Sequence, residues 1–419
     1  AYLRFIGALR LDGITVSGKC LRVGVIADGR FWMQTTERFD ISDLGLDLAD
    51  RNDRHAALRA TEGLVHDARN DLYYVARHAD INTVAHATDV FSSARGVTYF
   101  DSVPLSFVTM DDPEHARMRR TVSRQFTARY VSGLRERTRV YVDRALDPIQ
   151  PGEPVEVVDV LTAPIPLQII AEMLGLPASD LRFIRSWTDA MMDAGGRLEE
   201  PGVLESATGS FLSWTEYVDA QVADRIANPG SDLLSALANS GDEALDRDAL
   251  AMFATTLMVA GNETTRHTAS KAILTLANHP DQLSRLVDES VPVSTAVEEV
   301  LRWTSVARVM MRTVTRDTAV AGTALRSGDR VALLYPSGNR DELVFENADQ
   351  FLVDRTPNPH LAFGVGAHFC LGASLARMEL DAILTGLLRR YAHLALDAEP
   401  VYRSNGLVDG LASLRVRIS

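Results

Sequence analysis

The sequence predicts a mainly helical protein with small β-sheets, organised as one large domain. Long stretches have apolar residues at intervals of three and four, the spacing of one helix face, whereas alternating stretches are few and short. The Pro and Gly breaks at residues 150–154 and 228–231 are only as long as turns, so no linker separates two cores. With 419 residues, 46% of them hydrophobic and 24% charged, the chain can bury a sizeable core.

Along the chain, the helical spacing recurs many times and strand-like alternation appears three times. Helices are expected at 52–68, from 78 onward, and at 113–146, 159–174, 177–194, 209–227, 246–278 and 371–390. Strands are expected at 71–77, after Arg312 and at 330–335. Residues 1–32 contain repeated glycines, begin without methionine and lack the pattern of a signal peptide. We therefore expect Met33 to be the natural start, residues 1–32 to be an N-terminal extension and residues 33–419 to be the domain.

The charge and the cysteine content exclude several classes of protein. With 43 basic and 56 acidic side chains, the net charge is −13, which argues against nucleic-acid binding. No stretch has the roughly 18 uninterrupted apolar residues of a membrane span, so we expect a soluble protein without membrane insertion. The two cysteines exclude a disulfide framework and any zinc or iron–sulfur site built from several thiolates, and they fit the reducing cytoplasm.

One of these cysteines lies in the most specific segment of the chain, His360-Leu-Ala-Phe-Gly-Val-Gly-Ala-His-Phe-Cys-Leu-Gly. Its glycines permit a tight loop that presents Cys370 just before a helix, where backbone N–H groups can point at the sulfur. Such a position is expected to lower the pKa of the thiol and favour the thiolate. A single thiolate suits a metal held mainly by something other than the protein, and haem iron is the obvious candidate.

Three other interpretations of this loop compete with a haem site. A nucleotide-binding Gly-x-Gly-x-x-Gly loop fails because Phe369 occupies the third glycine position. Zinc bound by His360, His368 and Cys370 is possible by residue type, but the spacing matches no ordinary finger or ribbon. A structural turn with a buried cysteine is the default for a shorter match.

The whole loop resembles the haem-binding signature of the cytochrome P-450 superfamily. The matching positions are Phe363, Gly364, Gly366, His368, Cys370 and Gly372. The resemblance implies the cytochrome P-450 fold with a single haem domain, and haem b bound through Cys370 as the axial iron ligand. It further implies a bacterial, soluble member that depends on a ferredoxin.

The helix expected at 246–278 is abnormal at its centre, where Ala260-Gly-Asn-Glu-Thr-Thr places polar groups at the deepest point. An apolar stripe on one face ends in hydroxyls, and Gly261 would let a ligand approach the backbone. The functional interpretation is a local opening of the helix beside an oxygen-binding site. The alternative is a buried polar spot bonded back to its own carbonyls. The segment resembles the acid–alcohol pair of cytochrome P-450 monooxygenases, which implies that Glu263 and Thr264 deliver protons to bound oxygen. The residues of this face are Phe253, Leu257, Gly261, Thr264 and Thr268.

Charged residues in three other segments match the family in the right order. Alone, Glu299 and Arg302 would be expected to form a surface ion pair, and the other residues would be expected to be solvated charges. Glu299 and Arg302 resemble the Glu-x-x-Arg pair that supports the cysteine loop. His115 and Arg119 resemble a His-x-x-x-Arg clamp for the haem propionates, which arginine binds well. Arg312 and His368 match two further propionate partners, and Arg308 is a rival for the position of Arg312.

The resemblance implies a monooxygenase that inserts one oxygen atom from O2 into a C–H bond of a small, largely apolar substrate. A sterol, terpenoid or lipid-like substrate is expected, and a natural-product tailoring oxidase acting on a polyketide or peptide is the alternative. A peroxide-driven or a non-catalytic haem protein is the other class considered. Electrons are expected from NAD(P)H through a ferredoxin reductase and a ferredoxin.

Two sets of residues follow from that expectation. An arginine cluster is either a solvated helix face or a docking patch for an acidic ferredoxin; it comprises Arg117, Arg119, Arg120, Arg124, Arg129 and Arg135. The substrate pocket is expected to be lined by residues 97–107, 253–261, 306–310 and 407–408, which are largely apolar. Val306 replaces a proline that many relatives have, so the shape of this pocket is expected to differ.

Overall fold

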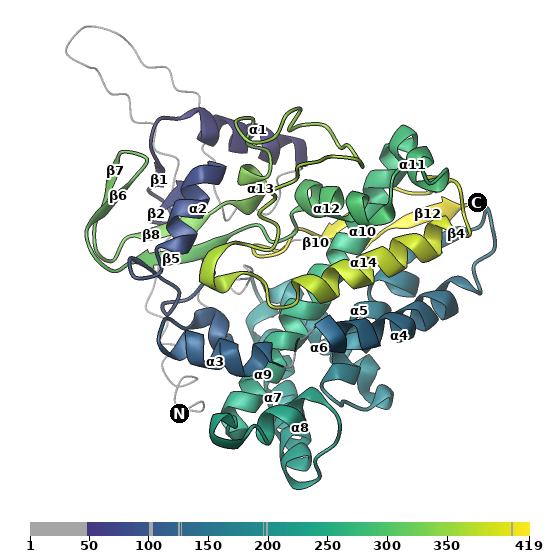
Figure 1. Ribbon diagram of the computed structural model, residues 1–419, viewed down its shortest axis with the longest axis horizontal. Coiled ribbons are helices and arrows are strands. Elements are labelled where there is room, and N and C mark those ends of the chain that lie inside the picture. Colours follow the sequence, from purple (N-terminus) through teal and green to yellow (C-terminus); the bar gives the residue numbers. More distant parts are fainter. Residues whose placement is uncertain are drawn as a thin grey trace, which may run out of the picture. The chain divides into compact units, whose positions relative to one another are not determined.

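The computed structural model describes residues 48–99, 104–124, 126, 128–195, 197, 200–403 and 405–419 (Figure 1). They belong to one compact unit, Phe39–Ser419. The expectations for residues 1–32 and for Met33 lie outside the described residues. No helix in the described ranges is long and apolar enough to cross a membrane.

Helices dominate the described chain, as predicted (Figure 1). Most are amphipathic and bury one face. They are α1 (Leu48–Ala60), α2 (His78–His86), α3 (Glu114–Ser123), α4 (Ala128–Leu146), α5 (Pro164–Met173), α6 (Leu181–Ala194), α7 (Val203–Ala227), α8 (Leu233–Ala238), α9 (Arg247–Leu257), α10 (Thr264–Asn278), α11 (Pro280–Val287), α12 (Val293–Thr304), α13 (Tyr335–Gly338) and α14 (Ala373–Leu388).

The strands form small sheets, which confirms the predicted fold class. They are β1 (Val65–Asp67), β2 (Leu72–Val75), β3 (Phe91–Ser92), β4 (Pro154–Glu156), β5 (Met310–Val314), β6 (Thr318–Val320), β7 (Thr323–Leu325), β8 (Arg330–Leu333), β9 (Leu394–Leu396), β10 (Val401–Arg403), β11 (Gly410–Ser413) and β12 (Arg415–Ile418). The largest sheet has the order β1-β2-β8-β5-β3, in which only β2 and β8 are parallel. The others are β4-β12-β9, β6-β7 and β10-β11.

The helix predicted at 246–278 is present and lies in the core. It consists of α9, a π-helical turn at Met258–Glu263 and α10, in unbroken succession. Every residue from Thr265 to Leu276 is buried. A helix that is buried all round must be covered on every side, and α12, α14, β9 and β11 pack against α10.

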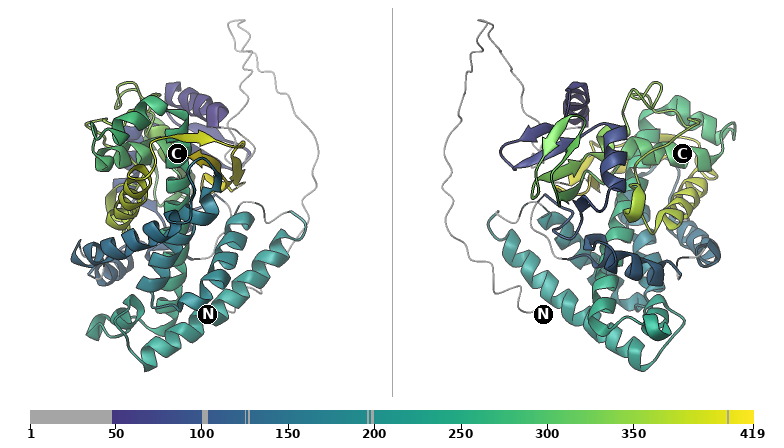
Figure 2. Two further views of the ribbon diagram at one scale, coloured as in Figure 1. Left: turned by 90° about the vertical axis from the view of Figure 1, so that its right-hand side faces the viewer. Right: turned by 60° about the vertical axis from the view of Figure 1, so that its left-hand side comes forward.

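A second helical layer supports the first half of this long helix. Helices α6 and α7 pack against each other, as the teal ribbons of Figure 2 show. The rings of Trp187 on α6 and Trp214 on α7 stack with centroids 3.9 Å apart. The indole Nε1–H of Trp214 donates to Oγ1 of Thr255 on α9 over 2.8 Å. This contact satisfies a buried indole and fixes α7 against α9.

Three predicted boundaries are wrong. The helix predicted at 52–68 ends at Ala60 because Gly63, at φ +75°, makes a left-handed turn, and β1 follows. The helix predicted at 113–146 is two helices, since α3 ends at Ser123 and α4 starts at Ala128. The helix predicted at 209–227 starts earlier, at Val203, after the left-handed Gly202.

Glu379 on α14 is a fully buried carboxyl with no hydrogen-bond partner among the described residues. Burial raises its pKa to about 8, so the folded protein holds a proton there that the unfolded chain has already lost at neutral pH. Its contribution to stability is therefore full below the ordinary glutamate pKa and is lost as the pH rises through about 8.

We predict that Glu379→Gln becomes progressively more stable than the parent protein between pH 5 and pH 8. The difference should grow by on the order of 1.4 kcal/mol for each pH unit in that window, because the amide has no proton to lose. Urea unfolding at several pH values measures this. The exposed Glu205→Gln is the control. A difference between Glu379→Gln and the parent that does not change with pH would contradict the buried neutral carboxyl.

Candidate active site

A cavity lies between the loop that precedes α14 and the long helix α9–α10. Its wall is largely apolar. Both the cysteine loop and the predicted face of the long helix contribute to it. The predicted residues that line it are Phe253, Leu257, Gly261, Glu263, Thr264, Thr268, Arg119, Arg312, Phe363, Gly364, His368, Cys370 and Gly372. Residues more than 200 positions apart in the sequence, such as Arg119 and Cys370, thus line the same cavity.

The cysteine loop is fixed by its own backbone. The N–H of Cys370 donates to the carbonyl of Phe363 over 2.9 Å, and the N–H of Phe369 donates to that of Gly366 over 3.1 Å. Gly366 has φ +73° and its backbone lies so close to Ala85 that a Cβ would be 2.6 Å from the carbonyl oxygen of Ala85. Gly366 therefore packs the loop onto α2 and does not line the cavity.

Cys370 is exposed to the cavity and surrounded by protein atoms elsewhere. Burial raises the pKa of its thiol, although the N–H of Gly372 and the guanidinium groups of Arg119 and Arg377 act in the opposite direction. The sequence predicted that the loop lowers the pKa of the Cys370 thiol. With only the protein groups acting on the thiol this prediction is wrong, because desolvation outweighs the N–H donor of the loop. A metal ion bound at the sulfur would stabilise the thiolate far more strongly.

A group of basic side chains converges on one side of the cavity. His115 is buried behind His368, with ring centroids 4.2 Å apart, and its Nε2 has no partner among the described residues. Burial lowers the pKa of His115. The pKa of His368 is lowered to about 3, mainly by burial and also by the charges of Arg312, His115 and Arg119. Burial also lowers the pKa of both Arg119 and Arg312. These groups together favour a bound anion that would offset their burial.

The two candidate arginines near β5 have different surroundings. Arg312 is buried, lines the cavity and donates from Nη1 to the carbonyl of Met311 over 2.7 Å. Arg308 instead donates from Nη1 to the carbonyl of Asn405 over 2.9 Å, and it is not part of the cavity wall. The structure therefore favours Arg312 over its rival.

A π-helical turn lies at the polar centre of the long helix, and the hydroxyls there bond back to carbonyls of the helix itself, as the alternative interpretation expected. The Oγ1–H of Thr264 donates to the carbonyl of Ala260 over 2.7 Å, and that of Thr265 donates to Gly261 over 3.0 Å. Because the Thr264 proton is engaged, its oxygen lone pairs remain available toward the cavity. A Cβ on Gly261 would lie 2.8 Å from Ile170, so this glycine also serves close packing of α5.

Glu263 is fully buried, and its carboxylate lies among polar side chains. Its Oε1 accepts from Nδ2 of Asn262 over 2.7 Å and lies 3.5 Å from Nη1 of Arg266. Burial alone would raise its pKa, but His267, Arg266 and Arg403 outweigh burial and lower it. The ionised carboxylate is thus the favoured form. Arg266 also contacts Asp189 on α6 over 2.7 Å.

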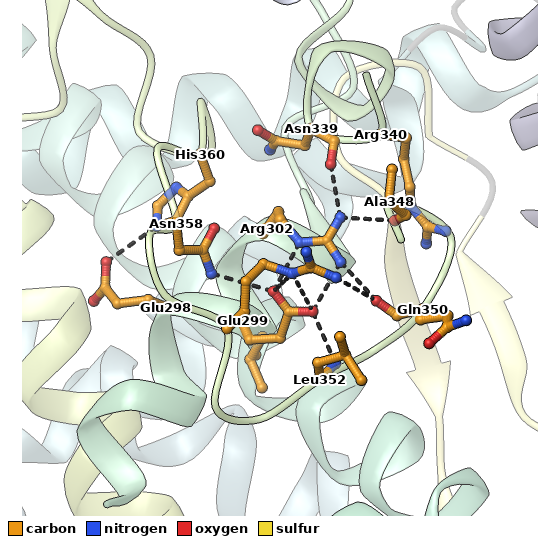
Figure 3. Close-up of polar contacts among 12 residues, drawn as sticks. Glu298, Glu299, Arg302, Asn339, Arg340, Ala348, Gln350, Leu352, Asn358 and His360 are labelled. Atoms are coloured by element: carbon orange, nitrogen blue, oxygen red, sulfur yellow. Dashed lines mark hydrogen bonds and ion pairs between the residues drawn. The ribbon is translucent and has the colours of Figure 1, made fainter. Parts of the chain in front are cut away.

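Glu299 and Arg302 form a fully buried pair rather than a surface one. Arg302 donates to the Glu299 carboxylate through Nε over 2.7 Å and through Nη2 over 2.8 Å. Its remaining donors reach the carbonyls of Asn339, Ala348 and Gln350 (Figure 3).

Arg355, which sequence reasoning missed, adds a second guanidinium, with Nε 3.0 Å from Oε2 of Glu299. The same carboxylate accepts from the backbone N–H of Leu352 over 2.9 Å and from Nδ2 of Asn358 over 3.1 Å (Figure 3). Every charge in the network therefore has hydrogen-bond partners, as a buried ion pair requires.

The residue before this pair also reaches the cysteine loop. Glu298 accepts from Nε of Arg377 over 2.7 Å and lies 3.1 Å from Nε2 of His360. The guanidinium of Arg377 stands over the Phe363 ring, 4.5 Å from its centroid. Burial alone would raise the pKa of Glu298, but Arg377 and His360 outweigh burial and lower this pKa to about 2. His360 is thus a support of the loop, which argues against the zinc interpretation.

Comparison with known proteins identifies the family. A family model described as Cytochrome P450 matches residues 215–412. The steroid C26-monooxygenase of Mycolicibacterium smegmatis is 33% identical over 378 residues, covering 89% of this chain and 94% of its own. The chain belongs to the cytochrome P450 superfamily. It is a cytochrome P450 monooxygenase.

Further relatives of this P450 agree. A methyl-branched lipid omega-hydroxylase of Mycobacterium tuberculosis is 35% identical over 364 residues, covering 83% of this chain and 82% of its own. The structure of Mycobacterium marinum cytochrome P450 CYP268A2 with pseudoionone has a TM-score of 0.82 at 30% identity, covering 91% of this chain and 99% of that one. A mutant of P450 EryK with erythromycin B has a TM-score of 0.80 at 32% identity, covering 88% and 96%.

The P450 family implies haem, and the cavity of this P450 fits it. One wall offers a single thiol, Cys370, and the basic group offers two guanidiniums and the unpartnered Nε2 of His115 for anionic propionates. Phe363 and the apolar side chains of the long helix suit the faces of a flat macrocycle.

We predict that Glu299→Gln destabilises this P450 by about 3–5 kcal/mol, because Arg302 and Arg355 would keep their buried charges without a carboxylate. Chemical denaturation measures the change. The matched control is the adjacent Glu298→Gln, whose side chain is 31% exposed and which should lose about 1 kcal/mol. Equal losses in the two variants would contradict the role of burial.

Proposed function

We propose that this P450 inserts one oxygen atom of O2 into a C–H bond of a sterol-like or methyl-branched lipid substrate. The apolar part of the cavity wall supports this, since it offers many aliphatic contacts and few hydrogen-bonding groups. It includes Val97, Leu105, Ile170, Met192, Val259, Val306, Leu407 and Val408. The two curated relatives described above are named for a steroid and a methyl-branched lipid. The expected lining stretches 253–261, 306–310 and 407–408 all contribute, and residues 100–103 lie outside the description.

In this proposal Cys370 would bind haem iron through its thiolate, and His115, Arg119, Arg312 and His368 would hold the propionates. When bound, haem supplies a redox-active iron that activates dioxygen with electrons received one at a time. The protein supplies orientation and charge. The cysteine loop and the Glu299 network fix the position of the Cys370 sulfur, while the apolar wall excludes water from the substrate.

Protons reach the reacting oxygen through Thr264 and Glu263. The Thr264 hydroxyl would accept a hydrogen bond at the cavity, and it would pass on a proton by turning its own O–H from the Ala260 carbonyl toward the cavity while it receives a replacement proton. Glu263 lies next to it and is ionised, so it can accept a proton from the interior and return it. Asp189, which is 29% exposed and bound to Arg266, links this buried acid to the protein surface.

We predict that Thr264→Ala keeps the haem and the substrate affinity but lowers the product formed per NAD(P)H, with the missing electrons recovered as hydrogen peroxide. The reason is that the variant loses the Thr264 hydroxyl, which lies at the cavity and which this proposal gives the role of passing on protons. Product, NAD(P)H and peroxide are measured together. Thr275→Ala, on the same helix but outside the cavity wall, is the control. Unchanged coupling in Thr264→Ala would refute the proton role.

The substrate class is tested by titrating the purified P450 with four compounds and recording the shift of its haem absorption band. A steroid that retains its side chain and a methyl-branched fatty acid should each give a low-spin to high-spin shift, because they displace water from the apolar cavity. A macrolide tests the alternative of natural-product tailoring, which the similarity to EryK favours. Succinate is the polar control. A shift with the macrolide alone would replace the lipid proposal by the tailoring one.

We further propose a ferredoxin as the electron donor, docking at exposed arginines of α3. Arg117 and Arg120 are exposed, whereas Arg124 and Arg135 of the predicted cluster pair with Glu243 and Asp381. Arg119 faces the cavity instead of the surface, and the Arg129 side chain lies outside the description.

If an acidic ferredoxin docks there, the rate of reduction should fall as salt rises, because screening weakens contacts between exposed charges. Arg117→Glu should slow reduction at low salt and flatten this dependence. Arg326→Glu, beside β7, is the control of equal charge change. Stopped-flow reduction of the P450 measures both. A rate independent of salt would contradict this docking surface.

A further inference from the structure

His267 is a buried histidine, one turn beyond Glu263, that the proposed function does not use. It lies on α10 with no accessible surface, and neither ring nitrogen has a hydrogen-bond partner among the described residues. Oε2 of Glu263 also lacks a partner there. These two groups face each other, with Nε2 of His267 3.4 Å from Oε2 of Glu263. A small movement of the Glu263 carboxylate into line with the Nε2–H of His267 would make a hydrogen bond that satisfies both.

The opposite side of the imidazole is fixed by the backbone of β11. A Cβ built on Gly410 would lie 2.5 Å from three atoms of the His267 ring, so no larger residue fits there. Strand β11 packs against α10 over several residues. The ring is therefore confined between Gly410 and Glu263 and has no space to rotate away from the carboxylate.

We propose that His267 is a positioning residue for the oxygenation reaction, donating its Nε2–H to Oε2 of Glu263 and holding that carboxylate ionised and oriented between proton transfers. The inference rests on the proposed proton role of Glu263 and assigns to a neighbouring side chain the control of that acid. His267 itself does not touch the cavity.

The charges around the ring fit a neutral donor. On its own helix the ring faces Glu263 and Arg266, and from β10 it experiences Arg403. Asp189 on α6 is paired with both arginines. Burial lowers the pKa of His267 and the arginines act in the same direction, which outweighs the carboxylate. A neutral imidazole adds a hydrogen bond to the carboxylate without adding another buried charge.

The consequence for the reaction is a shift in the pH range over which Glu263 can accept a proton. Burial pushes Glu263 toward its neutral form, and the hydrogen bond from His267 opposes that tendency. Without this donor Glu263 becomes protonated at a higher pH, and product formation per NAD(P)H then falls at a higher pH as well.

The experiment compares His267→Phe, which keeps a ring beside Gly410 but removes the donor, with His267→Gln, which keeps an N–H donor. Product per NAD(P)H is measured against pH in each variant. His267→Phe should move the acid-side midpoint upward by about one pH unit, the effect expected for losing one charge-assisted hydrogen bond. His267→Gln should restore it. Infrared difference spectra should show the neutral carboxyl band of Glu263 at a correspondingly higher pH in His267→Phe.

A Glu263→Gln background separates this inference from the proposed function. There, adding His267→Phe should cause no further shift. If Glu263→Gln alone leaves coupling unchanged, the proton role of Glu263 fails, and the inference fails with it. If Glu263→Gln lowers coupling but His267→Phe keeps the parent midpoint and infrared band, only the inference is overturned. Should His267→Phe not fold, His267→Leu, a smaller side chain that also lacks the donor, must give the same upward shift or overturn the inference.

Discussion

One buried carboxylate, that of Glu299, joins segments on which the rest of the site depends. It binds Arg302 on α12 and Arg355 near the start of the loop leading to the cysteine, and it accepts from Leu352 and Asn358. Desolvating three charges is unfavourable unless each has hydrogen-bond partners, so the network forms only when all of these segments are in place. The position of the cysteine loop therefore depends on the folding of α12 and the chain that follows it.

The opposite wall of the cavity obeys a different constraint. A helix buried on all sides should be apolar, yet α9–α10 places Glu263 and His267 in the core and Thr264 in the cavity wall. At the π turn, hydroxyls of α10 donate to carbonyls of the turn, and the charges of Arg266 on α10 and Arg403 on β10 act on the acid. The ring nitrogens of His267 have no hydrogen-bond partner among the described residues. The apolar wall and the buried polar spot together suit a reaction that excludes water while it supplies protons.

Local sequence was sufficient to predict much of this. The cysteine loop and the stripe from Phe253 to Thr268 were predictable because each lies within one contiguous segment, whose spacing fixes which side chains share a face. The spacing also predicted that Glu299 and Arg302 pair, but their role in supporting the loop came only from the family resemblance. The predicted fold class was confirmed for the same reason, since periodicity is a local property.

The remaining features depend on contacts between distant segments. Arg355 lies 56 residues from Glu299, and Asp189 lies 77 residues from Arg266, so no local pattern connects them. The raised pKa of the Cys370 thiol follows from surroundings supplied by the whole fold, which no loop motif contains. The ends of α1 and α3 were missed because the turns that stop them depend on single residues such as Gly63. The ring of His267 appears as a neighbour of Glu263 only once Gly410 of β11 is packed against it.

The central claim is that Cys370 is a thiolate ligand of haem, and the carbon monoxide difference spectrum of the reduced protein tests it most directly. The chain has one other cysteine, Cys20, so Cys20→Ser is a matched control for Cys370→Ser. We expect the long-wavelength Soret band of a thiolate-ligated haem in the parent protein and in Cys20→Ser, and its loss in Cys370→Ser. A parent protein without that band, or a Cys370→Ser variant that retains it, would contradict the account.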